Sequence, residues 1–137
     1  MPGPRQQIPP IRVLVVDDSP LVRRALVERL SDEDDLTVVG ACEDGSEVVA
    51  AAERLRPDVV FMDLSMPVMD GLEATEALCD VQEDARVIML TADGGSARDQ
   101  AEAAGARALV PKGTSPRRML ECLRTVVQDG DGCPFCF

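Results

Sequence analysis

The sequence predicts an α/β fold, a doubly wound five-stranded parallel sheet covered by helices on both faces. Short apolar runs alternate along the chain with segments whose apolar residues recur every three or four positions. Buried strands joined by helices run parallel, and such a sheet is apolar on both faces and needs helices on each. The 137 residues suit one domain. We place it at residues 11–128, between a flexible proline-rich arm at 1–10 and a tail at 129–137.

Five segments have the composition of buried strands. The first, IRVLVV, follows a proline pair, and the later ones are also rich in aliphatic residues. Each crossover between consecutive parallel strands should be right-handed. The predicted strands are residues 11–16, 36–42, 58–63, 86–91 and 107–111.

Five further segments have helical spacing of apolar or alanine residues. Ser19 is the expected N-cap of the first helix and Ser115 that of the last, and a proline follows each of them. The pair Arg56-Pro57 should end the second helix, and Gly105 should end the fourth. The predicted helices are residues 20–30, 46–55, 71–79, 96–104 and 115–128.

Composition excludes several classes of function. A net charge of −11 repels phosphates, so we expect no direct nucleic-acid binding by this domain. Without Trp or Tyr, the chain lacks the rings on which flavins or single-stranded nucleic acids stack. Without His, a metal would be held by oxygen or sulfur. The sequence has no apolar run of membrane-spanning length.

The five cysteines indicate a reducing compartment. An odd number of cysteines without a secretory signal predicts thiols in the cytoplasm. Cys42, Cys79 and Cys122 lie within apolar patterns and are expected to fill the core. Cys133 and Cys136 form a lone C-x-x-C, a weak signal for zinc or redox chemistry, and we interpret them as part of the tail.

Polar side chains follow the carboxyl ends of four predicted strands, where open parallel sheets bind ligands. Asp17 and Asp18 follow the first strand, and Asp63 ends the third. Thr91 ends the fourth strand, and Lys112 follows the fifth. Each residue alone would be an ordinary turn, cap or surface residue. Together they place three carboxylates, a hydroxyl and an ammonium group at one edge, which favours a functional site.

Three clustered carboxylates repel one another unless a hard cation lies among them. Oxygen donors without His favour Mg²⁺ or Mn²⁺. One carboxylate can act as a nucleophile toward phosphorus while the cation neutralises the transferred oxygens. Lys112 can bind a phosphoryl oxygen as a point charge, and Thr91 can donate a hydrogen bond to another.

These motifs resemble the receiver domain of two-component response regulators. The matching motifs are DD at 17–18, D-L-S-M-P-V-M-D-G at 63–71, L-T-A at 90–92 and Lys112. The resemblance extends from about Ile11 to Val127. It implies a flavodoxin-like (βα)5 fold with strand order 2-1-3-4-5.

The resemblance also implies roles in a metal and phosphorylation site. Asp63 would accept a phosphoryl group. Asp18 and Asp63 would bind Mg²⁺ through their side chains, Ser65 through its carbonyl group, and Asp17 mainly through water.

Further roles concern switching. Thr91 would be the switch hydroxyl, Lys112 would pair with the phosphoryl group, and Pro67 and Gly71 would shape the loop after the third strand. Where family members often have an aromatic switch residue, this chain has Leu109. Its signal should therefore use backbone shifts or aliphatic repacking.

The subfamily stays open at this point. The spacing from Thr91 to Lys112 and the absence of a Lys-Pro pair resemble receivers of helix-turn-helix DNA-binding regulators. The opening segment I-R-V-L-V-V-D-D-S-P-L-V-R-R-A-L instead resembles chemotaxis methylesterase receivers.

The predicted function is a signalling switch, phosphorylated by a histidine kinase or phosphotransfer protein. It would catalyse only its own phosphorylation and dephosphorylation. One alternative is a receiver-like interaction module that phosphorylation does not control. Another is an aspartate-nucleophile phosphohydrolase of the haloacid-dehalogenase type, but Ser65 stands where that class has its general acid. A flavodoxin-type flavin carrier would need a hydroxyl-rich phosphate loop in place of DDSP.

The predicted output surface is the 92–128 face. Gly94 and Gly95 let the loop after Thr91 change its backbone conformation at low cost. The helix predicted at 96–104 has few large apolar anchors and should be locally unstable. We therefore expect an output partner on this face; the sequence does not identify it, and homodimerisation is left open.

Overall fold

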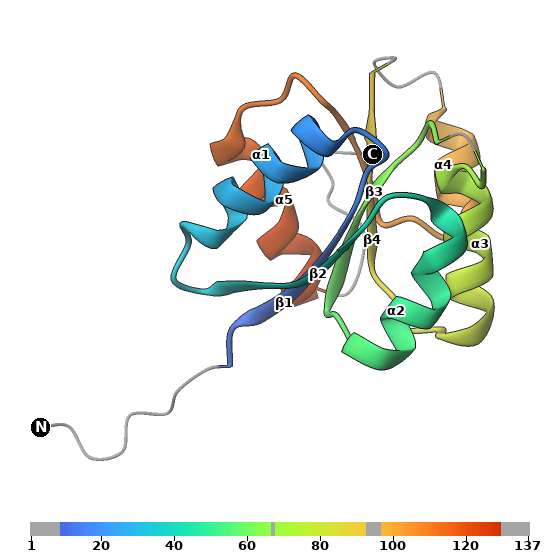
Figure 1. Ribbon diagram of the computed structural model, residues 1–137, viewed down its shortest axis with the longest axis horizontal. Helices are drawn as coiled ribbons and strands as arrows, with labels where there is room; N and C mark the ends of the chain where they lie inside the picture. The colour runs from blue at the N-terminus through green and yellow to red at the C-terminus, as the bar shows by residue number, and fades with distance from the viewer. Residues whose placement is uncertain (1–8, 67, 93–96, 130–137) are drawn as a thin grey trace, which may run out of the picture.

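In the computed structural model, which describes residues 9–66, 68–92 and 97–129, strands and helices alternate along the chain (Figure 1). The strands are β1 (Ile11–Val16), β2 (Leu36–Cys42), β3 (Val59–Asp63), β4 (Val87–Thr91) and β5 (Ala108–Pro111). The helices are α1 (Pro20–Ser31), α2 (Val48–Leu55), α3 (Gly71–Val81), α4 (Arg98–Ala104) and α5 (Pro116–Asp129), with a 3-10 turn, η1 (Gly45–Glu47), before α2.

The strands form one parallel sheet in the order β2-β1-β3-β4-β5. This confirms the predicted fold class and strand order. The chain starts at β1, moves outward to β2, and returns past β1 to β3. The direction of winding therefore reverses between β1 and β3, so the connections after these two strands leave toward opposite faces. Such a reversal opens a crevice at the carboxyl ends of the strands.

Helices α1 and α5 cover one face of the sheet, and α2, α3 and α4 cover the other (Figure 1). Alternate residues of each strand supply the two cores, because successive side chains point to opposite faces. Val15 and Phe61 pack with the α1 and α5 side, whereas Val16 and Met62 pack with the other side. Apart from Phe61, the buried core of the described residues has no aromatic ring, as the composition predicted.

The predicted helix caps are present. The Oγ of Ser19 accepts a hydrogen bond from the Val22 N–H at 3.3 Å, and the Oγ of Ser115 accepts one from the Arg118 N–H at 3.3 Å. Each bond satisfies a backbone donor that the first helical turn leaves unpaired.

The second helix begins later than predicted. Residues 46–47 belong to the 3-10 turn η1, and α2 starts at Val48. Asp44 and Glu47 form a capping box, in which Asp44 accepts from Ser46 and Glu47 accepts from Asp44. These bonds satisfy the first N–H groups in a tighter turn, so the α-helix starts only beyond it. Helix α3 also extends to Val81, beyond the predicted end at residue 79.

Two of the three cysteines expected in the core are buried, Cys42 and Cys122, whereas Cys79 is only half-buried. The predictions made for Pro67, for Gly94 and Gly95, for the arm before residue 9 and for the C-x-x-C lie outside the described residues. Within the described part of the chain, none of the helices combines the length and apolar character that crossing a membrane requires.

Burial predicts how two apolar side chains differ in their contribution to stability. Phe61 is 0% exposed in the central strand β3, whereas Leu21 of α1 is 78% exposed. We expect Phe61→Ala to lower the free energy of unfolding by about 3–5 kcal/mol through lost burial and a new cavity. Leu21→Ala should change it by less than about 0.5 kcal/mol. Urea unfolding followed by circular dichroism measures both, and equal losses would contradict the packing described above.

Candidate functional site

The charged side chains predicted to meet at the sheet edge do so. Asp17, Asp18 and Asp63 each offer a carboxylate oxygen, and these oxygens all lie within 4.8 Å of one another. The Nζ of Lys112 lies 3.1 Å from Asp63 Oδ1 and 3.4 Å from Asp17 Oδ2. Thr91 is buried at the end of the neighbouring strand β4.

Strand register explains this assembly. Val16, the last residue of β1, pairs with Met62 of β3, so Asp17 and Asp63, which follow them in the chain, lie side by side. Lys112 follows β5, two strands away from β3, and its long side chain reaches back across the end of β4. Its backbone N–H donates to the Thr91 carbonyl oxygen at 2.8 Å, and this bond fixes the position of the backbone from which the Lys112 side chain extends.

Asp17 is 0% exposed, and its hydrogen bonds hold it firmly. Its N–H donates to the Cys42 carbonyl oxygen at 3.1 Å, and its Oδ1 accepts from the Ser19 N–H at 2.9 Å. Its Oδ2 is buried without a well-formed hydrogen bond among the described residues and faces Lys112 at 3.4 Å. A buried carboxylate oxygen in this state is short of positive charge.

Asp18 and Asp63 differ in exposure. Asp18 points to the surface, whereas Asp63 is 2% exposed. The N–H of Ser65 donates to Asp63 Oδ1 at 3.3 Å. The site thus combines two buried carboxylates with one that solvent and ligands can reach.

Gly71 lets the loop after β3 return close to Asp63. A Cβ atom on Gly71 would lie 2.4 Å from the Asp63 carbonyl oxygen, and the Gly71 N–H donates to the Leu64 carbonyl oxygen at 2.9 Å. Only glycine fits without moving the backbone of the candidate acceptor. Gly45 belongs to no motif that singles it out, yet a Cβ there would lie 2.5 Å from the Met69 carbonyl oxygen. Gly45 therefore lets the loop after β2 pack directly against the loop after β3.

The ionisation of the site reflects burial and crowding. Burial raises the pKa of Asp63 to about 6, the negative charge of Asp17 adds to the increase, and the contacts from Lys112 and Ser65 oppose it. Burial alone would lower the pKa of Lys112, but its contacts with Asp63 and Asp17 outweigh burial and raise it. Lys112 is therefore charged at neutral pH, and one ammonium group is shared by two buried carboxylates.

A family model described as "Response regulator receiver domain" matches residues 13–124, a range that contains every one of these strand-end residues. The chain belongs to the response-regulator receiver domain family. This match confirms the resemblance that the motifs indicated. In this receiver domain, position 109 is a leucine that is 5% exposed and pairs with Met89 of β4. The position of the expected switch ring is thus filled by an aliphatic core residue.

The chain is similar to known proteins of two kinds, a response regulator and a protein-glutamate methylesterase. The chain is 40% identical over 117 residues to response regulator GacA of Pseudomonas viridiflava. That match covers 85% of this chain and 55% of that protein. It is also 55% identical over 69 residues to protein-glutamate methylesterase/protein-glutamine glutaminase 4 of Myxococcus xanthus. That match covers 50% of this chain and 20% of that protein. The chain thus spans about half or less of the length of these relatives, and the methylesterase match lies within the receiver part of this chain.

A solved structure with the same fold is a CheX-CheY-BeF3-Mg+2 complex from Borrelia burgdorferi. It matches with a TM-score of 0.79 and 26% identity, over 86% of this chain and 90% of that one.

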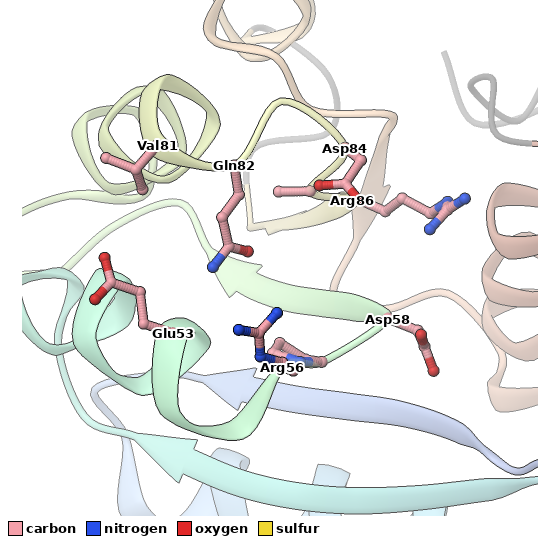
Figure 2. A pocket seen from close by; sticks show the side chains of 9 residues that line it. Glu53, Arg56, Asp58, Val81, Gln82, Asp84 and Arg86 are labelled. Carbon is pink, nitrogen blue, oxygen red and sulfur yellow. The ribbon is translucent and has the colours of Figure 1, made fainter.

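A hollow lies at the amino ends of β3 and β4, the opposite end of these strands from Asp63 and Thr91 (Figure 2). It encloses about 700 Å³ between the carboxyl ends of α2 and α3 and the segments that lead into β3 and β4. Cationic Arg56 and Arg86 alternate there with carboxylates, and the Arg86 side chain extends away from Arg56 in this view. This hollow holds none of the strand-end residues Asp17, Asp18, Asp63, Thr91 and Lys112. The residues that line it are Glu53, Arg56, Pro57, Asp58, Val81, Gln82, Asp84, Ala85 and Arg86.

The raised pKa of Asp63 predicts a pH-dependent stability without divalent cations. Its folded-state pKa of about 6 exceeds the ordinary value of 3.8, so the folded protein binds this proton more tightly than the unfolded chain does. The associated stability is present below the unfolded pKa and is lost as pH rises through about 6. Asp63→Asn cannot ionise. Its stability relative to wild type should therefore rise between about pH 4 and 7, by on the order of 1–3 kcal/mol.

Urea unfolding in the presence of a chelator measures this difference at each pH. Asp84→Asn is the matched control, because its carboxylate is exposed at the far end of the sheet. A stability difference between Asp63→Asn and wild type that stays constant across the pH range would contradict the buried, crowded environment assigned to Asp63.

Proposed function

We propose that this receiver domain accepts a phosphoryl group on Asp63 and works as a Mg²⁺-dependent signalling switch. The observation that carries the proposal is the setting of Asp63, a buried carboxylate with Lys112 Nζ at 3.1 Å and two further carboxylates beside it. This set combines a nucleophile, a fixed cation for phosphoryl oxygens and an acidic cluster in one crevice.

The residues present fit a divalent cation. All three clustered carboxylates offer oxygen, the donor that Mg²⁺ prefers, and the buried Oδ2 of Asp17 is short of positive charge. Asp18 and Asp63 would hold Mg²⁺ through their side chains, Ser65 through its carbonyl group, and Asp17 mainly through water. When bound, the ion supplies positive charge to the oxygens of the transferred group. The Mg²⁺ named with the Borrelia CheY complex supports this choice of metal.

The side chains of the domain have distinct tasks in the transfer. Lys112 and the Ser65 N–H both contact Oδ1 of Asp63, which leaves Oδ2 as the oxygen that attacks phosphorus. A new Oδ2–P bond forms while the bond from phosphorus to the donor's imidazole nitrogen breaks, and that nitrogen keeps the electron pair. Lys112 then neutralises charge on the phosphoryl group. The Thr91 hydroxyl donates to another phosphoryl oxygen and draws the end of β4 toward the site.

The donor we propose is a histidine kinase or phosphotransfer protein, which is consistent with the absence of His from this chain. We propose that the exchange takes place in the cytoplasm. No disulfide joins the described cysteines, which is consistent with a reducing compartment. The domain catalyses only its own phosphorylation and dephosphorylation.

The output surface we propose is formed by α4, β5 and α5. Helix α4 has seven residues, and its N-cap residue, Ala97, makes no side-chain capping bond. It buries only small side chains, Ala101 and Ala104. A short helix with no side-chain N-cap and few anchors shifts at low cost, so it can respond to movement of Thr91.

Labelling with acetyl phosphate tests the acceptor. We expect wild type with Mg²⁺ to gain one phosphoryl group by intact mass, whereas Asp63→Asn, or wild type with a chelator, should gain none. Asp84→Asn, at the other end of the sheet, is the matched control and should label like wild type. Labelling of Asp63→Asn would place the acceptor elsewhere. No labelling of folded wild type would favour an interaction module that phosphorylation does not control.

Amide hydrogen exchange with and without beryllofluoride and Mg²⁺ tests the output surface. We expect exchange rates to change at the site and also in α4 and β5, with the largest distant effect in the weakly anchored α4. A comparison with α2, on the same side of the sheet but outside the surface, controls for general stabilisation (Figure 1). Changes confined to residues 17–18 and 63–71 would rule out this surface.

A further inference from the structure

Two consecutive arginines of α1 have opposite environments. The side chain of Arg24 is 81% exposed and pairs with Glu28 at 3.6 Å, within its own helix. Arg23 is half-buried, and its Nη1 donates a hydrogen bond to the backbone carbonyl oxygen of Asp17 at 2.6 Å. Within the described residues, no carboxylate forms an ion pair with Arg23. Its guanidinium group is therefore directed at one peptide group of the acidic crevice.

That peptide group joins the two aspartates. The carbonyl of Asp17 and the N–H of Asp18 belong to the same planar unit. Two other hydrogen bonds already hold Asp17. Its N–H donates to the Cys42 carbonyl oxygen, and its side-chain Oδ1 accepts from the Ser19 N–H. Arg23 holds the carbonyl group of Asp17, and the orientation of this peptide group determines the position of the Asp18 Cα atom.

Asp18 needs such a constraint more than its neighbours do. Asp17 and Asp63 are buried and held by hydrogen bonds and by Lys112. Asp18 is exposed, and none of the described residues donates a hydrogen bond to its carboxylate. Its position therefore depends on the backbone from which it projects.

The location of Arg23 opposes local electrostatic preference. It is the fourth residue of α1, near the amino end, where the helix dipole disfavours a cation, and the first turn has no acidic residue to compensate. Residues that break a local preference often serve a site elsewhere. Here the hydrogen bond to Asp17 supplies the compensating contact.

We propose that Arg23 is a positioning residue for the cation site, acting through the Asp17–Asp18 peptide to orient the Asp18 carboxylate. This inference rests on the proposed function and identifies a residue outside the set of strand-end ligands. Neighbours that orient metal ligands typically change metal affinity by about 10–100-fold when they are removed.

Charge and position predict effects of opposite sign. A positive charge near a cation site opposes cation binding, so if Arg23 acted only through its charge, its removal would tighten Mg²⁺ binding. If Arg23 orients Asp18, its removal should weaken Mg²⁺ binding despite the loss of a repulsive charge. The direction of the change therefore separates the two roles.

Mg²⁺ titration of the 15N-labelled full chain, followed by amide NMR, measures the Kd. We expect Arg23→Met, which keeps the apolar stem, to raise the Kd for Mg²⁺ about tenfold. Arg23→Lys keeps the charge and a donor and should recover part of the affinity. Arg24→Met, the matched control on the same helix, should stay within about twofold of wild type. In the metal-free protein, the amide resonance of Asp18 should shift or broaden in Arg23→Met and stay unchanged in Arg24→Met.

A Kd for Arg23→Met equal to or below that of wild type would overturn the positioning role while leaving the cation site intact. Should Arg23→Met fail to fold, Arg23→Gln, which is also neutral, decides by the same criterion. If wild type itself bound no Mg²⁺ at Asp17, Asp18 and Asp63, the proposed cation site would be wrong, and this role of Arg23 with it.

Discussion

Two carboxylates buried side by side are the constraint around which the rest of the receiver domain is arranged. Parallel pairing of β1 with β3 brings Asp17 next to Asp63, out of reach of the water that normally stabilises charge. The repulsion this creates is only partly offset by Lys112, which both carboxylates share. Burial, and after it the negative charge of Asp17, raise the pKa of Asp63 even though Lys112 opposes the increase. A divalent cation is the chemical partner that buried, crowded carboxylates favour.

Much of this site could be predicted because the sequence pattern indicates where each buried strand ends. Each buried strand is a continuous apolar run, so the polar residue that follows it marks the edge where parallel strands bind ligands. Asp17, Asp63, Thr91 and Lys112 were all found in this way, and the family motif added Ser65. The strand order was implied by the family and not by the pattern, because apolar runs do not reveal which strands are neighbours.

The parts that were missed depend on contacts between distant segments. The bond from Arg23 to the Asp17 carbonyl depends on how α1 lies over the end of β1, and the tight fit of Gly45 depends on two loops meeting. Neither residue interrupts a pattern, since arginine is common in helices and glycine is common in turns. The helical spacing likewise placed residues 46–47 in an α-helix, whereas the side-chain bonds of Asp44 and Glu47 favour the 3-10 turn.

Under the proposed phosphorylation of Asp63, Lys112 offers a route for the signal that needs no aromatic switch. Its ammonium group contacts Asp63, while its backbone N–H bonds to the carbonyl oxygen of Thr91. A phosphoryl group on Asp63 would engage the side chain of Lys112 and the hydroxyl of Thr91 at once, and these two residues already share a backbone bond. The ends of β4 and β5 would then move as a unit. Since Thr91 precedes α4 and Lys112 precedes α5, that movement would reach the weakly anchored α4 through the backbone, and Leu109 would need only to repack among its aliphatic neighbours.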